Sequence, residues 1–164
     1  MIAEAQIAEL WQSPDNIASS TSLIVNALER VDQETNFDQI VVTSKISPFM
    51  GIEPLSGSLS VPLNKGLVFW RETSGLFRVE PFIIGNLAAG QRVAVVDSMT
   101  YPRNVRAVVG SLVEAGYKPV AFMSLVCLDE NAQEEIELSA QEFNVKTLKY
   151  YPPEFTFSPL APAA

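Results

Sequence analysis

Histidine is absent from this chain of 164 residues, and cysteine occurs once. Without histidine the chain lacks the usual general base and the commonest zinc ligand, so serine-histidine and cysteine-histidine catalysis are excluded. A lone cysteine excludes an internal disulfide, and Cys127 lies in the apolar run VAFMSLVCL, which indicates a packed strand residue. No tetrahedral nitrogen and sulfur metal site can be assembled from these residues. The sequence therefore predicts no metal site of its own.

Basic residues are also scarce, since 11 Lys and Arg stand against 19 Asp and Glu and give a net charge of -8. The field of such a chain repels polyanions, and no cluster of Lys and Arg interrupts it, so nucleic-acid binding is disfavoured. No apolar run approaches the roughly 18 residues that would suggest a membrane span. The first residues, MIAEAQIAELW, carry acids where a signal peptide needs a basic start. We expect a cytoplasmic protein that binds neither nucleic acid nor membranes.

An alternation of strand and helix patterns fills most of the chain. Apolar residues recur at three- and four-residue steps from Ile17 to Val31, which predicts a helix with Asp15 as its N-cap. Short runs rich in β-branched residues predict strands over 38–44, 67–71, 92–97, 119–128 and 145–150. Helical candidates lie between them, over 51–63, 104–116 and 131–143, with Gly116 as the stop of the second.

This order predicts a single α/β domain with a mostly parallel central sheet and helices on both faces. The run VAVVD is apolar at every position up to Asp97, so we expect it to form a central strand. Ligands of such sheets bind beyond the carboxyl ends of the strands. We divide the chain into an N-terminal helical segment, 1–36, an α/β core, 37–150, and a proline-rich tail, 151–164.

Two stretches, 37–75 and 85–130, resemble the type I phosphoribosyltransferases, and the orotate phosphoribosyltransferases most of all. The most specific part is LxxGQRVAVVD leading into a helix that ends in LxEAGYKPV. The resemblance implies transfer of a phosphoribosyl group from phosphoribosyl pyrophosphate, held with magnesium, onto a base such as orotate. It also implies a homodimer that pairs around 49–63, and it makes residues 1–36 a reduced form of the hood that covers the base.

The same resemblance assigns a candidate phosphate site. Asp97 matches the first acid of the family signature, which faces the ribose hydroxyls, while Ser98 replaces the second acid. The turn that would wrap the 5'-phosphate consists of Tyr101, Pro102, Arg103, Asn104 and Val105, where the family has small hydroxyl residues and glycines. Proline has no N–H to donate. Losing two charge-assisted hydrogen bonds costs about 3 to 6 kcal/mol, or roughly 10² to 10⁴ in affinity, of which Arg103 can return a part.

Two further loops supply the remaining ligand candidates. Lys45 lies after the first strand, where the family has its pyrophosphate loop, and a solvated loop lysine is the competing interpretation. Arg71 and Glu72 match the basic-acidic start of the family's mobile catalytic loop. The rest of that segment, 72–82, contains no lysine or histidine to neutralise a departing pyrophosphate.

Three functions remain open on these grounds. The first is an orotate phosphoribosyltransferase-like protein that is catalytically inactive and serves in binding, regulation or assembly, with a nucleotide or phosphate as its ligand. The second is an active phosphoribosyltransferase that uses phosphoribosyl pyrophosphate with magnesium. The third is a structural partner that docks on another protein. A homodimer is also expected because several large apolar residues would be hard to bury in so small a domain. These residues are Trp11, Phe49, Met50, Trp70, Phe77 and Phe82.

Overall fold

A computed structural model describes residues 14–44, 53–71, 82–86, 88–100, 102–127 and 130–149. Its elements are α2 (Pro14–Thr35), β1 (Gln39–Ser44), α3 (Glu53–Leu63), β2 (Gly66–Arg71), β3 (Phe82–Ile84), β4 (Arg92–Thr100), α4 (Pro102–Glu114), β5 (Lys118–Cys127), α5 (Glu130–Gln141) and β6 (Lys146–Lys149). The six strands form one sheet in the order β3-β2-β1-β4-β5-β6. All neighbouring strands are parallel except β2 and β3. The predicted single α/β domain with a mostly parallel sheet is confirmed.

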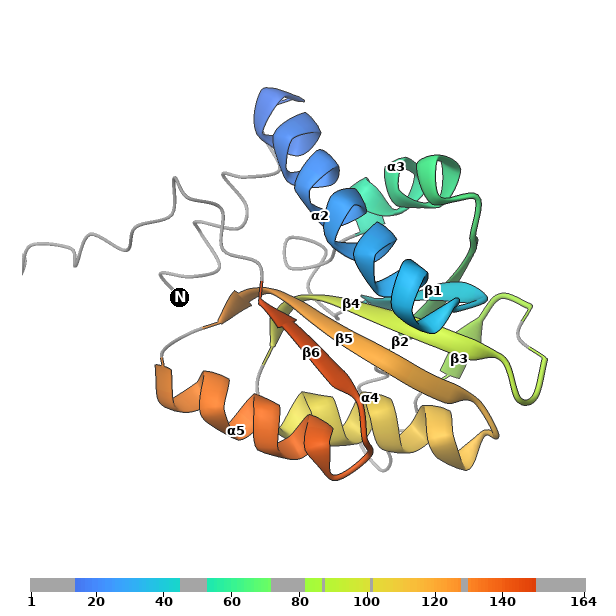
Figure 1. The fold of residues 1–164 in the computed structure, drawn as a ribbon, viewed down its shortest axis with the longest axis vertical. Helices are drawn as coiled ribbons and strands as arrows, with labels where there is room; N and C mark the ends of the chain where they lie inside the picture. The colour runs from blue at the N-terminus through green and yellow to red at the C-terminus, as the bar shows by residue number, and fades with distance from the viewer. Residues whose placement is uncertain are drawn as a thin grey trace, which may run out of the picture.

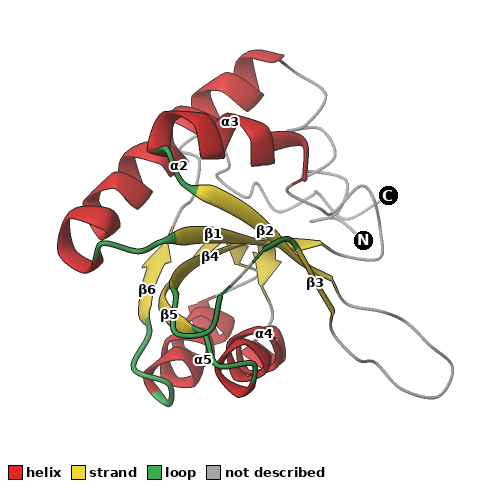
Figure 2. Cartoon of the chain, turned by 90° about the vertical axis from the view of Figure 1, so that its right-hand side faces the viewer, coloured by secondary structure: helices red, strands yellow, loops and turns green. Residues whose placement is uncertain are grey.

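Helices cover both faces of this sheet (Figures 1 and 2). The helices α2 and α3 pack on one face, called here the α2 face, and α4 and α5 pack on the other, the α4 face. Side chains alternate across a strand, so Ile40 and Val42 point to the α2 face while Val41 points to the α4 face. Burial on both faces explains why the central strands are continuously apolar. The expected central position of VAVVD is confirmed, because β4 lies between β1 and β5 with Ala94 and Val96 fully buried.

All four described helices end at a residue in the left-handed conformation. The residues that follow α2, α3, α4 and α5 in this way are Asn36, Asn64, Gly116 and Asn144, with φ of 48°, 50°, 86° and 56°. After α4 the N–H of Tyr117 donates to the carbonyl of Leu112 at 2.9 Å, which closes the helix in the Schellman pattern. Asparagine and glycine are the residues that tolerate this conformation best. The prediction that Gly116 stops its helix is confirmed.

One local prediction is wrong, and one strand was missed. Asp15 is not an N-cap, because α2 already begins at Pro14 and Asp15 lies in its first turn. Proline suits the first helical position, where its missing N–H would have no partner, and the Asp15 carboxylate still lies near the positive end of the helix dipole. The strand β3 was not predicted, since its three residues are too few to show an alternating pattern.

Trp70 was expected to be among the residues that need a partner subunit for their burial, and the structure corrects this. Its side chain is 6% exposed, and its indole N–H donates to Ser111 Oγ of α4 at 2.8 Å. An indole buried with its N–H satisfied is a stable core residue. The other aromatic residues used in that argument, and the tail 151–164, lie outside the residues or side chains that the structure describes.

The N-terminal helix is part of the same core as the sheet. Ile24, Leu28 and Val31 of α2 are buried against β1 and β4 residues. Near the C-terminal end of α2, Lys65 Nζ donates to the carbonyl of Phe37 at 2.7 Å and forms an ion pair with Asp32 Oδ1 at 2.9 Å. Of the described helices, none combines the length and the apolar character needed to cross a membrane.

Glycine is required at the turn after β3. Gly85 has φ of 137°, and a Cβ there would lie 3.0 Å from Val68 Cγ2 and 3.3 Å from the Leu67 carbonyl oxygen. We predict that Gly85→Ala lowers the free energy of unfolding by about 1 to 3 kcal/mol in urea titrations. Gly57→Ala is the matched control, because it lies in α3 with nothing within 4 Å and should raise stability by about 0.5 to 1 kcal/mol. Equal stability of the two variants would contradict this prediction.

Candidate functional site

The strands β1 and β4 form the switch point of the sheet. The chain leaves β1 towards α3 on the α2 face, and it leaves β4 towards α4 on the opposite face (Figure 2). In open α/β sheets, ligands bind beyond the carboxyl ends of two strands that diverge in this way. The backbone pairing of the two strands ends at Val42 and Val96, although β1 continues to Ser44 and β4 to Thr100. The residues after this pair therefore define the candidate site.

Asp97 is the first residue of β4 beyond that pairing. Its side chain is 0% exposed, and Thr43 of β1 donates its hydroxyl to Asp97 Oδ1. Ser124 of β5 is paired in register with Asp97 and is 5% exposed. These three residues follow the alternation of their strands onto the α4 face, where they form a polar row across three neighbouring strands. The ligand role that the resemblance gives to Asp97 stays a prediction.

The sequence analysis missed Thr43 and Ser124. Their signal was visible, because each is the polar residue that interrupts an apolar run, in IVVTS and in VAFMSLVCL. The sequence alone does not reveal the register of β1, β4 and β5, which places Thr43 and Ser124 beside Asp97. That register depends on how three separate strands align, which is a long-range property.

The junction between β4 and α4 differs from the expected phosphate turn. Met99 and Thr100 are still paired with Val126 and Cys127 of β5, and α4 begins at Pro102. Only Tyr101 separates the strand from the helix in the sequence. The prediction of a turn over 101–105 is therefore wrong from the second residue onward, because proline is well suited to begin a helix.

The sequence of this junction, 98–105, contains no glycine. A phosphate cradle converges several backbone N–H groups on one anion. Here β4 extends to Thr100, and the first residue of α4, Pro102, has no N–H. Within the described ranges, no group of three or more His, Cys, Asp or Glu residues is placed to hold a metal ion.

The other predicted ligand residues divide into two groups. Arg71 is exposed at the end of β2, and Asn104 is partly buried in the first turn of α4. Both lie at the carboxyl end of the sheet, as does Asp97. Lys45 and Tyr101 lie outside the residues that the structure describes, as do the side chains of Ser98 and Arg103.

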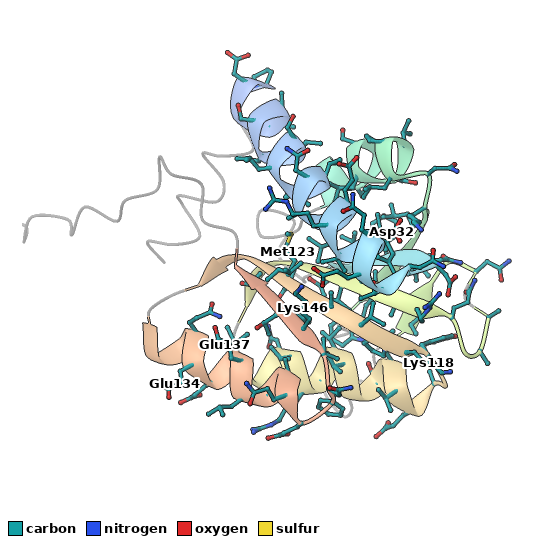
Figure 3. All side chains as sticks on the ribbon, in the orientation of Figure 1. Asp32, Lys118, Met123, Glu134, Glu137 and Lys146 are labelled. Atoms are coloured by element: carbon teal, nitrogen blue, oxygen red, sulfur yellow. The ribbon has the colours of Figure 1, made fainter. Side chains whose placement is uncertain are left out.

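An exposed ion pair joins the two helices of the α4 face. Arg106 Nη2 and Nε of α4 donate to Glu142, just after α5, at 2.6 and 3.1 Å. The hydrogen bond from Arg106, with the attraction between the charges, lowers the pKa of the Glu142 carboxyl, and the same contact raises the pKa of Arg106. Figure 3 shows this side of the sheet through Glu134 and Glu137 on α5, whereas Met123 of β5 lies towards α2.

We predict that Glu142→Gln causes a small loss of stability that depends on pH. A carboxyl whose pKa is lowered by folding stabilises the native state above its unfolded pKa, and this contribution disappears as the pH falls through the folded pKa. The difference between the wild type and Glu142→Gln should therefore be present at neutral pH and vanish below the ordinary carboxyl range. Glu134→Gln, an exposed glutamate of the same region, is the control. Urea midpoints measured across acid pH that show no such convergence would contradict the prediction.

Comparison with known proteins gives a structural likeness only. No protein-family model matches the sequence, and no curated protein matches it. Among solved structures, an orotate phosphoribosyltransferase from Aeropyrum pernix matches with a TM-score of 0.65 and 20% identity, over 88% of this chain and 76% of that one. The adenine phosphoribosyltransferase from Saccharomyces cerevisiae matches with a TM-score of 0.62 and 17% identity, over 85% and 82%. The chain has the type I phosphoribosyltransferase fold.

The UMP synthase of Leishmania donovani also shares this fold. It matches with a TM-score of 0.63 and 17% identity over 90% of this chain, which corresponds to 29% of the longer enzyme chain. Orotate and adenine enzymes thus match almost equally well. A phosphoribosyltransferase fold is established for this chain, and the fold does not distinguish the orotate enzymes from the adenine enzymes.

Proposed function

We propose that this chain is an orotate phosphoribosyltransferase-like protein that does not transfer phosphoribose and that serves in binding, regulation or assembly. The observation that carries the proposal is the junction between β4 and α4. Four of the five residues to which the resemblance assigns the phosphate turn, 102–105, belong to α4, and Met99 and Thr100 just before that turn are paired with β5. Pro102 removes one N–H donor from the helix start, so a 5'-phosphate there would meet fewer backbone donors than a glycine-rich turn offers.

The residue types around the junction support the same proposal. Ser98 stands in place of the second acid, so a ribose diol has at most one of its two usual carboxylate partners. The segment 72–82 offers no lysine or histidine to stabilise pyrophosphate as it leaves. Of the ligand candidates whose side chains the structure describes, Arg71 is exposed and Asn104 is partly exposed. They suit a phosphate or nucleotide held without a reaction.

Active phosphoribosyl transfer is the competing function, because two of the matching solved structures named above are phosphoribosyltransferases. If this chain is an enzyme, phosphoribosyl transfer from phosphoribosyl pyrophosphate with magnesium is the reaction to expect. The two functions differ in one measurable quantity, the affinity for that diphosphate.

We predict that calorimetry with phosphoribosyl pyrophosphate and magnesium detects no useful affinity, and that neither orotate nor adenine is converted. A matched variant restores the family pattern, with Ser98→Asp, Pro102→Thr, Arg103→Gly and Asn104→Gly. If the junction is the limiting defect, this variant should gain at least about tenfold in affinity, because it regains charge-assisted hydrogen bonds. A dissociation constant of the unaltered chain in the low micromolar range would show that the proposal is wrong.

We also propose a homodimer that uses the region 49–63. Val61, on α3 within this region, is 81% exposed, the highest value among the exposed large apolar residues that the structure describes. A single exposed valine is ordinary on a protein surface, so the proposal rests on the resemblance, whose family pairs through this region, and Val61 supplies the position at which to test it.

Light scattering at micromolar concentration should then give twice the mass of the 18.0 kDa chain. Val61→Asp should shift the mass towards that of one chain, since it would bury a charge in the interface. Val113→Asp, at a valine 45% exposed on α4, should leave the mass unchanged. The mass of a single chain for the unaltered protein would refute the dimer.

A further inference from the structure

We infer that Asp97 is an internal clamp of the switch point, whose carboxylate holds β1 to β4 and does not contact a ligand. The inference goes beyond the proposed function, because it concerns a residue that the resemblance assigns to the ribose. It starts from position: the backbone ladder between β1 and β4 ends at Val42 and Val96, and Thr43 and Asp97 are the next residues on each strand.

The contact between these two residues replaces the ladder at the point where it stops. Thr43 donates its hydroxyl to Asp97 Oδ1 across the two strands. After Ser44 and Thr100 the chain continues to α3 and to α4, which lie on opposite faces of the sheet, and within the described residues the backbone pairing of β1 with β4 extends no further than Val42 and Val96. A side-chain hydrogen bond at this position therefore helps to align the half of the sheet formed by β3, β2 and β1 with the half formed by β4, β5 and β6.

The surroundings of Asp97 are those of an interior residue. Asp97 and Thr43 are 0% and 1% exposed, and Ser124 stands in register on the other side of Asp97 at 5%. The next residues towards the amino end on this face, Val41 and Val95, are fully buried apolar side chains. A carboxylate in such a place is costly unless hydrogen bonds satisfy it, and the neighbouring hydroxyl supplies one.

This burial also separates Asp97 from the surface on which a ligand would lie. A ribose diol needs carboxylate oxygens that it can reach, and this side chain has no exposed area. The row points to the α4 face, under the layer that α4 and α5 form, and Trp70, opposite Thr43 on β2, bonds to Ser111 of α4 in the same layer. The carboxylate thus belongs to the packing between sheet and helices.

The test is a double-mutant cycle in urea, followed by circular dichroism. Thr43→Val keeps the shape of the side chain and removes the donor, so the unfolding equilibrium constant should rise roughly 10- to 100-fold. Thr43→Ser retains the hydroxyl and should recover most of this loss. Asp97→Asn should also destabilise, and the double variant should lose clearly less than the product of the two single effects. Thr35→Val is the control, because it removes a hydroxyl bonded only to the Val31 carbonyl of its own helix.

Several outcomes would overturn the clamp. The clamp would be refuted if Thr43→Val were no less stable than Thr35→Val. It would also be refuted if the changes that the two single variants cause in the unfolding equilibrium constant multiplied to give the change in the double variant. If Thr43→Val does not fold, amide hydrogen exchange of the unaltered protein tests the clamp instead. Amides of 42–43 and 96–97 should then exchange only with global unfolding, and exchange by local opening would refute the clamp.

A binding measurement on the unaltered chain and on Asp97→Asn tests this inference separately from the proposed function. If the unaltered chain binds phosphoribosyl pyrophosphate with magnesium, the proposed function is wrong. The urea experiments would still test the clamp independently. If the unaltered chain binds and Asp97→Asn abolishes this binding at unchanged stability, Asp97 is a ligand residue and the clamp is wrong.

Discussion

The burial of β1 and β4 on both faces is the constraint on which the rest of this structure depends. Valine, isoleucine and alanine side chains pack upwards against α2 and α3 and downwards against α4 and α5. A strand covered twice has no face left for solvent, so every position up to the end of its ladder must be apolar or internally satisfied. The first polar side chain of β4 after its N-terminal residue, that of Asp97, follows directly after the last pair with β1.

The same constraint explains why the helices leave the two strands in opposite directions. Each connection must return over the sheet to cover one of its faces, and a single face would leave half of the apolar side chains in water. The consequence is a switch point in the middle of the sheet. Fold and candidate site therefore have one origin, whatever chemistry remains at that place.

Much of this arrangement could be predicted from the sequence because it follows from local patterns. The strands around Val41 and Val95 and the stop at Gly116 depend on neighbours within a few residues, and the structure has them where the pattern indicates. The beginning of α4 at Pro102 had a local signal that was missed, because proline favours the first position of a helix. The length of β4 could not be predicted, since it depends on pairing of Met99 and Thr100 with a strand that comes later in the chain. The row of Thr43, Asp97 and Ser124 was missed for the same reason.

The short junction at Tyr101 has a consequence for how such chains are compared. Four of the five positions that the resemblance assigns to the phosphate turn, 102–105, belong to the first turn of α4. A chain can thus carry a residue at each position of an expected binding turn and still form regular helix there, so the number of residues between two elements does not by itself reveal a binding loop.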